Sequence, residues 1–142
     1  MAVAPNVKAA PAVDVAHPAV ERPLTRIAFG ACAKQDKDQP IWDAVLAAKP
    51  DLFIFLGDNI YADTRDPAVM AAKYAMLAAK PGFRKLRDTV PVIAIWDDHD
   101  FGYNDSDGTS PYKASALKVF RNFWANPSYG EPDNPGVYFK QS

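Results

Sequence analysis

The segment best suited to chemistry is Trp96–Gly102, in which three aspartates surround His99. It follows directly on the apolar run Val92–Trp96, which has the character of a buried strand. A strand that ends in such a cluster places carboxylate oxygens and an imidazole at the edge of a sheet. Because carboxylates brought close together cost Coulombic and desolvation energy unless a cation or hydrogen bonds offset it, the pattern favours a bound metal ion.

A second segment of the same kind is Gly57–Asp63, which follows the apolar run Leu52–Leu56. Asp58 is the best candidate for a carboxylate shared between two cations, and Asp98 could hold the second cation. Two cations can clamp the attacking and leaving oxygens of a phosphoryl transfer. His99 could protonate the leaving group or stabilise the phosphoryl oxygens, since imidazole titrates near neutral pH.

Tyr61 and Cys32 are further candidate ligands. A phenol has a pKa near 10, so only a strong Lewis acid such as ferric iron would bind Tyr61 as phenolate. Cys32 could bind the same ion as thiolate, because a coordinated thiol loses its proton.

Each of these residues also has an ordinary structural interpretation. Asp58 could form a turn or cap a helix, and His99 could simply pair with an aspartate. Cys32 could be a small buried apolar residue, and Tyr61 could serve packing. The remaining aspartates of these loops are expected to be loop residues, some of which support the ligands from behind: Asp63, Asp97, Asp100, Asp105 and Asp107.

The elements that would position these residues alternate between strands and helices. We expect strands at Thr25–Gly30, Leu52–Leu56 and Val92–Trp96. We expect helices at Pro40–Lys49, Pro67–Ala79 and Ser110–Trp124, with Ser110 as an N-cap, a short turn at Phe83–Arg87 and the start of a strand at Val137–Lys140. This order predicts an α/β fold with a parallel βαβαβ sheet. Ligands bind at the carboxyl ends of such strands, where all the candidate residues fall.

Composition limits the other functions. The chain has 142 residues and a net charge of −1 with no Lys/Arg block, so nucleic acid is not expected as a stable partner. No apolar stretch approaches the roughly 18 residues of a membrane span, and no signal peptide is visible. Residues 1–23, rich in Ala, Val and Pro, are expected to form an extended, poorly ordered leader before a domain at 24–142.

Three motifs together resemble those of a known family. They are Phe29–Cys32, Leu56–Asp63 and Trp96–Asp105, and in order and spacing they are similar to the alkaline phosphatase D (PhoD-like) branch of the calcineurin-like metallophosphoesterases. The resemblance covers roughly Thr25 to Lys140. It implies one half of a four-layer α/β/β/α sandwich. It also implies a metal-dependent phosphomonoesterase or phosphodiesterase that uses a metal-activated water, and an extracytoplasmic location.

The resemblance also implies roles for single residues. Cys32, Asp58 and Tyr61 match the family's iron-ligand positions, and Asp98 matches another metal ligand. His99, beside Asp98, matches the catalytic histidine. The implied cofactors are two or more metal ions, iron with calcium, or else manganese or zinc. An unrelated α/β domain that binds a single magnesium ion fits the spacing of these residues less well.

Family members are longer than this chain, and their second half supplies further ligands. We therefore expect the chain to correspond to the N-terminal half of the catalytic domain. Its site would be completed by a second copy in a homo-oligomer or by a complementing second half, and its substrate would be a phosphate ester. The alternative is a non-catalytic half-domain that binds metal or oligomerises, because a half-sandwich leaves one apolar sheet face exposed.

Overall fold

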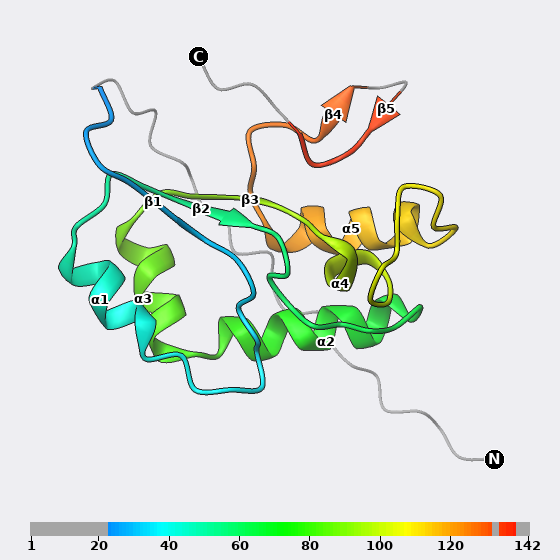
Figure 1. The fold of residues 1–142 in the computed structure, drawn as a ribbon, viewed down its shortest axis with the longest axis horizontal. Coiled ribbons are helices and arrows are strands. Elements are labelled where there is room, and N and C mark those ends of the chain that lie inside the picture. The colour runs from blue at the N-terminus through cyan, green and yellow to red at the C-terminus, as the bar shows by residue number, and fades with distance from the viewer. Residues whose placement is uncertain (1–22, 132–133, 139–142) are drawn as a thin grey trace.

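The computed structural model describes residues 23–131 and 134–138, and Figure 1 shows their arrangement. The expected leader therefore lies outside the described residues, apart from Pro23. Along the chain the strands are β1 (Ile27–Gly30), β2 (Leu52–Leu56), β3 (Val92–Ile95), β4 (Gly130–Glu131) and β5 (Asn134–Pro135). The helices are α1 (Ile41–Ala47), α2 (Pro67–Ala78), α3 (Pro81–Thr89), α4 (Asp98–Phe101) and α5 (Lys113–Phe123).

The first three strands form a parallel sheet in the order β1-β2-β3, which confirms the predicted α/β arrangement. In register, Phe29 lies opposite Ile54, and Ile54 opposite Ile93. Beyond β3, the side-chain amide of Asn126 accepts a hydrogen bond from the Ala94 backbone N–H at 3.0 Å and donates to its carbonyl at 2.6 Å. Asn126 thus satisfies backbone groups that a further strand would otherwise pair.

The hydrophobic core lies on one face of this sheet, the face that the helices cover (Figure 1). Phe53 and Phe55 of β2 point into it and are almost fully buried. Trp42 of α1 contacts both rings at 5.8 Å between centroids, and the Trp124 ring lies 4.8 Å from that of Phe55. This aromatic cluster holds the helices against the strands and so fixes where the strands end.

The opposite face of the sheet is apolar and exposed. Ile27 and Phe29 of β1 are 48% and 69% exposed, and Leu56 and Ile95 continue the surface on the next strands. Alternate residues of a strand point to opposite faces, so the sheet places these side chains together away from the helices.

Several boundaries differ from expectation. The short turn expected at Phe83–Arg87 is the full helix α3, which Pro81 begins at its first position. Ser110 does not cap α5: the Lys113 N–H bonds to the Ser110 carbonyl, three residues back, so the chain makes a turn before the helix begins. The strand expected at Val137–Lys140 is wrong for the described part, because Val137 and Tyr138 follow the β4–β5 hairpin outside any strand; its last two residues lie outside the described range.

Two elements were not expected from the sequence. Helix α4 is formed by the histidine segment itself and is capped by Asp97 in a capping box with Asp100. The β4–β5 hairpin lies between the last expected helix and the expected strand at Val137–Lys140. No helix among the described residues has the length and apolarity to span a bilayer.

Candidate metal centre at the strand exits

The chain segments that leave β1, β2 and β3 lie side by side. The Cys32 N–H donates to the Gly57 carbonyl at 3.2 Å, and the Ala33 N–H donates to the Asp58 carbonyl at 2.9 Å. Gly57, with φ of +107°, passes so close to the third exit that an added Cβ would lie 2.7 Å from the Cβ of Asp97. Only glycine accommodates both this contact and this backbone conformation.

Asp100 ties the second and third exits together. This fully buried carboxylate accepts hydrogen bonds from the backbone N–H groups of Asn59 (3.1 Å), Ile60 (3.2 Å) and Asp97 (3.0 Å). The Asn59 side-chain amide and the Tyr74 hydroxyl also donate to it, at 3.2 and 3.1 Å. Burial raises the pKa of Asp100 to about 7, and hydrogen bonds from its neighbours oppose that rise. One side chain therefore sets the distance between the two loops that carry the candidate ligands.

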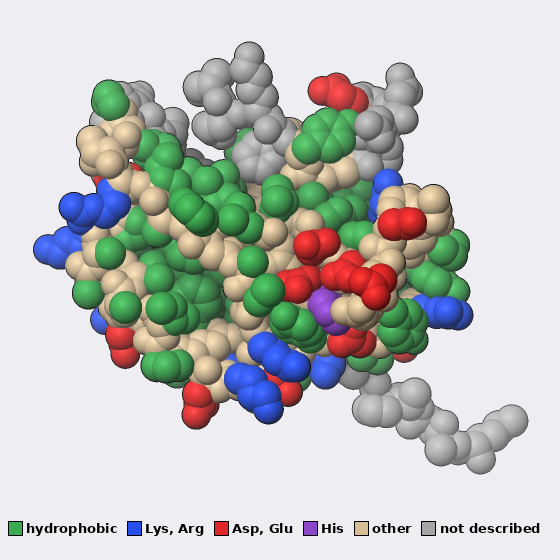
Figure 2. Space-filling model, in the orientation of Figure 1, with side chains coloured by type: hydrophobic (Ala, Val, Ile, Leu, Met, Phe, Trp, Pro, Cys, Tyr) green, Lys and Arg blue, Asp and Glu red, His purple; other side chains and the backbone are tan. Residues whose placement is uncertain are grey.

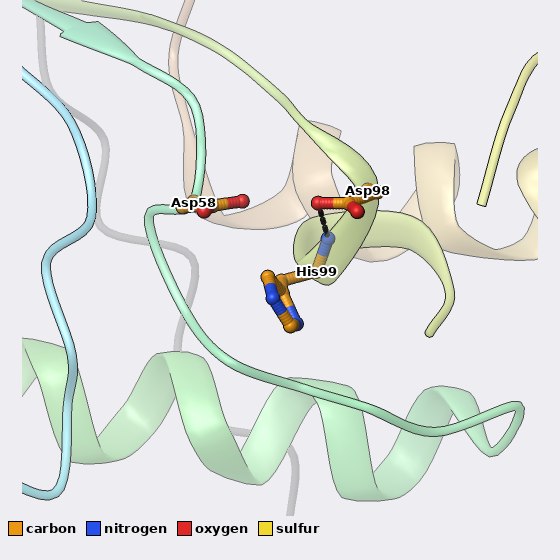
Figure 3. Close-up of side chains that lie close together, drawn as sticks. All are labelled: Asp58, Asp98 and His99. Atoms are coloured by element: carbon orange, nitrogen blue, oxygen red, sulfur yellow. Dashed lines mark hydrogen bonds between the residues drawn. The ribbon is translucent and has the colours of Figure 1, made fainter. Parts of the chain in front are cut away.

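The loops bring Asp58, Asp98 and His99 together, as predicted. One ligand atom of each lies within 4.8 Å of the other two, and all three side chains are half-buried. Figure 3 shows Asp58, from the exit of β2, facing Asp98 and His99 at the start of α4. In Figure 2 acidic side chains gather around the histidine on this face. Two carboxylates and an imidazole form a donor set that suits a divalent or trivalent cation.

The hydrogen bonding of Asp58 fits a cation. Its Oδ1 is buried and has no hydrogen-bond partner among the described residues, and Oδ2 accepts only a long contact from the Cys32 Sγ at 3.6 Å. Burial raises the pKa of Asp58, and the charges of Asp98 and Asp97 add to the rise, whereas His99 and Cys32 lower it. A cation would supply the missing partner for Oδ1 and offset the repulsion between the carboxylates.

Asp63 orients His99. Its Oδ1 lies 2.5 Å from the Nδ1 of the imidazole, which is 14% exposed. Burial acts to lower the pKa of His99, but the hydrogen bond and charge of Asp63 outweigh it, and with Asp58 and Asp98 they raise the pKa above its ordinary value. The prediction that some loop aspartates support the ligands is consistent with this contact. With Nδ1 held by Asp63, Nε2 is the nitrogen that can reach a substrate.

Tyr61 and Cys32 adjoin Asp58. The Tyr61 ring lies 4.4 Å from the His99 ring between centroids. Burial, followed by contact with Cys32 and Asp58, raises the pKa of the Tyr61 phenol. Cys32 is exposed, so the interpretation of this residue as a small buried apolar side chain is wrong. Both side chains therefore border the candidate centre at Asp58.

Backbone strain concentrates at the same place. Cys32, Asp58, Asp63 and Asp105 have positive φ angles of 61°, 49°, 46° and 64°. Aspartate tolerates this region better than most residues, but cysteine rarely adopts it. Such conformations persist where the surrounding structure imposes them, and they cluster at functional sites.

Two supporting residues, Gln35 and Asn59, were not found from the sequence, and Asp100 was named only as one of several loop aspartates. Gln35 is buried, and its side-chain amide bonds to the Tyr61 backbone. It accepts a hydrogen bond from the Tyr61 N–H at 2.8 Å and donates one to the Tyr61 carbonyl at 3.2 Å. Asn59 and Asp100 link the two loops. The only signal in the sequence for these residues is their position beside or within the motifs. Nothing in the sequence distinguishes the buried Asp100 from the more exposed aspartates beside it.

In comparisons with known proteins, no family model, no curated protein and no solved structure matches the chain.

Proposed function

We propose that this chain is part of a metal-dependent phosphoric ester hydrolase of the alkaline phosphatase D type. In this proposal the chain forms one half of a four-layer α/β/β/α sandwich. The observation that carries the proposal is the meeting of Asp58, Asp98 and His99 within 4.8 Å at the exits of neighbouring parallel strands. The buried Asp58 oxygen without a partner supports a cation there rather than a self-sufficient hydrogen-bond network.

In this proposal some residues of the chain hold the cations, and another moves a proton. Asp58 and Asp98 would hold them, with Cys32 and Tyr61 beside Asp58 as further ligands; iron with calcium is the proposed pair, and manganese or zinc the alternatives. Bound cations would neutralise phosphate charge and lower the pKa of a water molecule. A second copy, or a complementing second half, would supply the remaining ligands. From the resemblance, the proposal also includes an extracytoplasmic location.

His99 would act at the leaving group. In the hydrolysis, the water oxygen forms the new bond to phosphorus, the ester P–O bond breaks, and the departing oxygen takes a proton from the His99 Nε2. The attacking water loses one proton to solvent, and the His99 Nε2 takes up one proton from solvent, so the imidazole is restored for the next turnover. Asp63 keeps the imidazole in the orientation this step requires, through its contact with Nδ1.

The test is hydrolysis of bis(p-nitrophenyl) phosphate and p-nitrophenyl phosphate by the purified chain, together with its metal content. Asp58→Ala is expected to abolish both metal binding and turnover, and Asp43→Ala, which removes an exposed carboxylate on α1, is the matched control. If the metal is ferric iron, Tyr61→Phe should remove the phenolate charge-transfer band. Equal metal content and equal turnover in Asp58→Ala and the parent chain would refute the proposal.

A second candidate function is a non-catalytic module that binds metal or associates with a second copy. The exposed apolar face of the sheet favours it, since Phe29 and Ile27 have no cover among the described residues. Sedimentation of the chain beside Ile27→Lys distinguishes the two cases. Association lost in this variant, together with no metal-dependent turnover in the parent, would favour the module.

A further inference from the structure

A cavity of about 450 Å³ lies between α1 and the loop that leaves β1. Aromatic side chains of the core line it: Trp42, Phe53 and Phe55. Its size falls within the range of small-molecule sites, and a mainly apolar lining with few polar groups is typical of them.

Gly30 lines the cavity, and an added Cβ there would make an ordinary contact with the Phe53 Cζ at 3.6 Å. Ile41, at the start of α1, also lines it and is 58% exposed. An apolar ligand in the cavity would remove apolar surface of Ile41 from water.

The cavity borders the candidate metal centre. Cys32 lines it and also contacts the Asp58 Oδ2 at 3.6 Å. Lys34 lines it too, with its Nζ 4.8 Å from the centre of the Tyr61 ring, which lies 4.4 Å from the His99 ring between centroids. Figure 2 shows basic side chains beside the acidic group around the histidine. Cys32 and Lys34 therefore connect the lining of the cavity to the residues of the candidate centre.

We propose that this cavity binds the organic part of the substrate, and that this part is aromatic or similarly apolar. The inference rests on the proposed hydrolase function. The phosphoryl group would lie at Asp58, Asp98 and His99, and Lys34, between the two regions, would attract its negative charge. A substrate with a polar alcohol such as glycerol would leave Ile41 in water, so the site would discriminate between substrates by their leaving group.

Binding without turnover is the first test. The probe is 2-naphthol, which carries the aromatic group without the phosphate, titrated calorimetrically into the full chain. Ile41→Asp is expected to weaken this binding about tenfold, since it places a charge at the apolar rim. Val69→Asp is the matched control: Val69 is likewise an exposed apolar residue in the first turn of a helix, α2, but does not line the cavity.

A second variant keeps the test decisive if Ile41→Asp does not fold. Gly30→Ala places a methyl group inside the cavity at a tolerated distance from Phe53, and should also weaken 2-naphthol binding. Absence of binding in the parent chain, or equal binding in the parent and these variants, would overturn the inference.

Turnover separates this inference from the proposed function. Ile41→Asp should lower the ratio of kcat/KM for 2-naphthyl phosphate to kcat/KM for glycerol phosphate about tenfold, whereas Val69→Asp should leave it unchanged. Hydrolysis of both esters with an unchanged ratio in Ile41→Asp would overturn the substrate assignment and leave the hydrolase standing. Naphthol binding that depends on Ile41, with no hydrolysis of any ester, would overturn the proposed function and the substrate assignment with it.

Discussion

Replacing Asp100 by asparagine tests whether one buried carboxylate holds the centre together. The substitution keeps the size of the side chain but converts one acceptor oxygen into an NH₂ donor. If the NH₂ group takes the Oδ2 position it faces three N–H donors, from Asn59 and Asp97. If it takes the Oδ1 position it faces the Ile60 N–H and the Tyr74 hydroxyl, and the hydroxyl can rotate to accept.

Placing the NH₂ group at the Oδ1 position costs less free energy, but it still leaves the Ile60 N–H without an acceptor. A buried donor left in this way costs about 1–3 kcal/mol. At a pH above the Asp100 pKa of about 7, where the carboxylate is ionised, the remaining hydrogen bonds also change from charged to neutral acceptors, which roughly halves their strength. We therefore expect Asp100→Asn to lower the free energy of unfolding by about 3 kcal/mol. At about 1–1.5 kcal/mol per molar urea, the unfolding midpoint would fall by about 2 M or more.

The assay is urea unfolding followed by circular dichroism, with Asp43→Asn as the control. Asp43 is exposed, so the same chemical change there should stay within about 0.5 kcal/mol. Asp100→Asn should also weaken manganese binding in calorimetry, because the loops carrying Asp58 and Asp98 lose their common anchor. A variant within 1 kcal/mol of the parent, with unaltered manganese affinity, would show that Asp100 does not hold the two loops.

Two further predictions concern backbone and pH. Gly57→Ala should destabilise the fold by about 2 kcal/mol or more, since its Cβ would meet Asp97 at 2.7 Å, whereas Gly108→Ala, where an added Cβ has nothing within 4 Å, should have almost no effect in the same urea assay. Burial raises the pKa of Tyr129 above its ordinary value, so the unfolded chain loses this proton first and the parent should lose stability as pH rises above about 10. Tyr129→Phe should flatten that alkaline loss in urea titrations at successive pH values, and an unchanged slope would contradict the assignment.

The parallel sheet and the place of the centre could be predicted because both depend on local pattern. Continuous apolar runs bounded by Gly-Asp and Asp-Asp indicate buried strands and where they end. Parallel strands have their carboxyl ends on one edge, so Asp58, Asp98 and His99 had to converge once the strands were recognised. The helix at Pro81–Thr89 was underestimated because its apolar residues are few, and Phe83 and Leu86 are buried only through tertiary contacts.

The different roles of the neighbouring aspartates could not be predicted from the sequence. Asp97, Asp98 and Asp100 stand within four positions, yet one caps a helix, one faces the candidate metal centre and one is fully buried. Which of them turns inward depends on where the tertiary structure places the Asn59 and Ile60 backbone N–H groups. Cys32 is exposed and has a left-handed backbone, and neither property follows from its residue type.

The different roles of Asp100 and Asp58 explain how acidic side chains can lie close together although not all of their oxygens are hydrogen-bonded within the protein. Asp100 accepts five hydrogen bonds and links the two loops, so Asp58 is not needed for this link, and its buried Oδ1 has no partner among the described residues. A site in which the anchor and the ligand are different residues can bind and release a cation without rebuilding its loops. The same separation predicts that Asp58→Ala and Asp100→Asn should differ in kind: the first should lose metal while folding normally, and the second should lose stability and metal together.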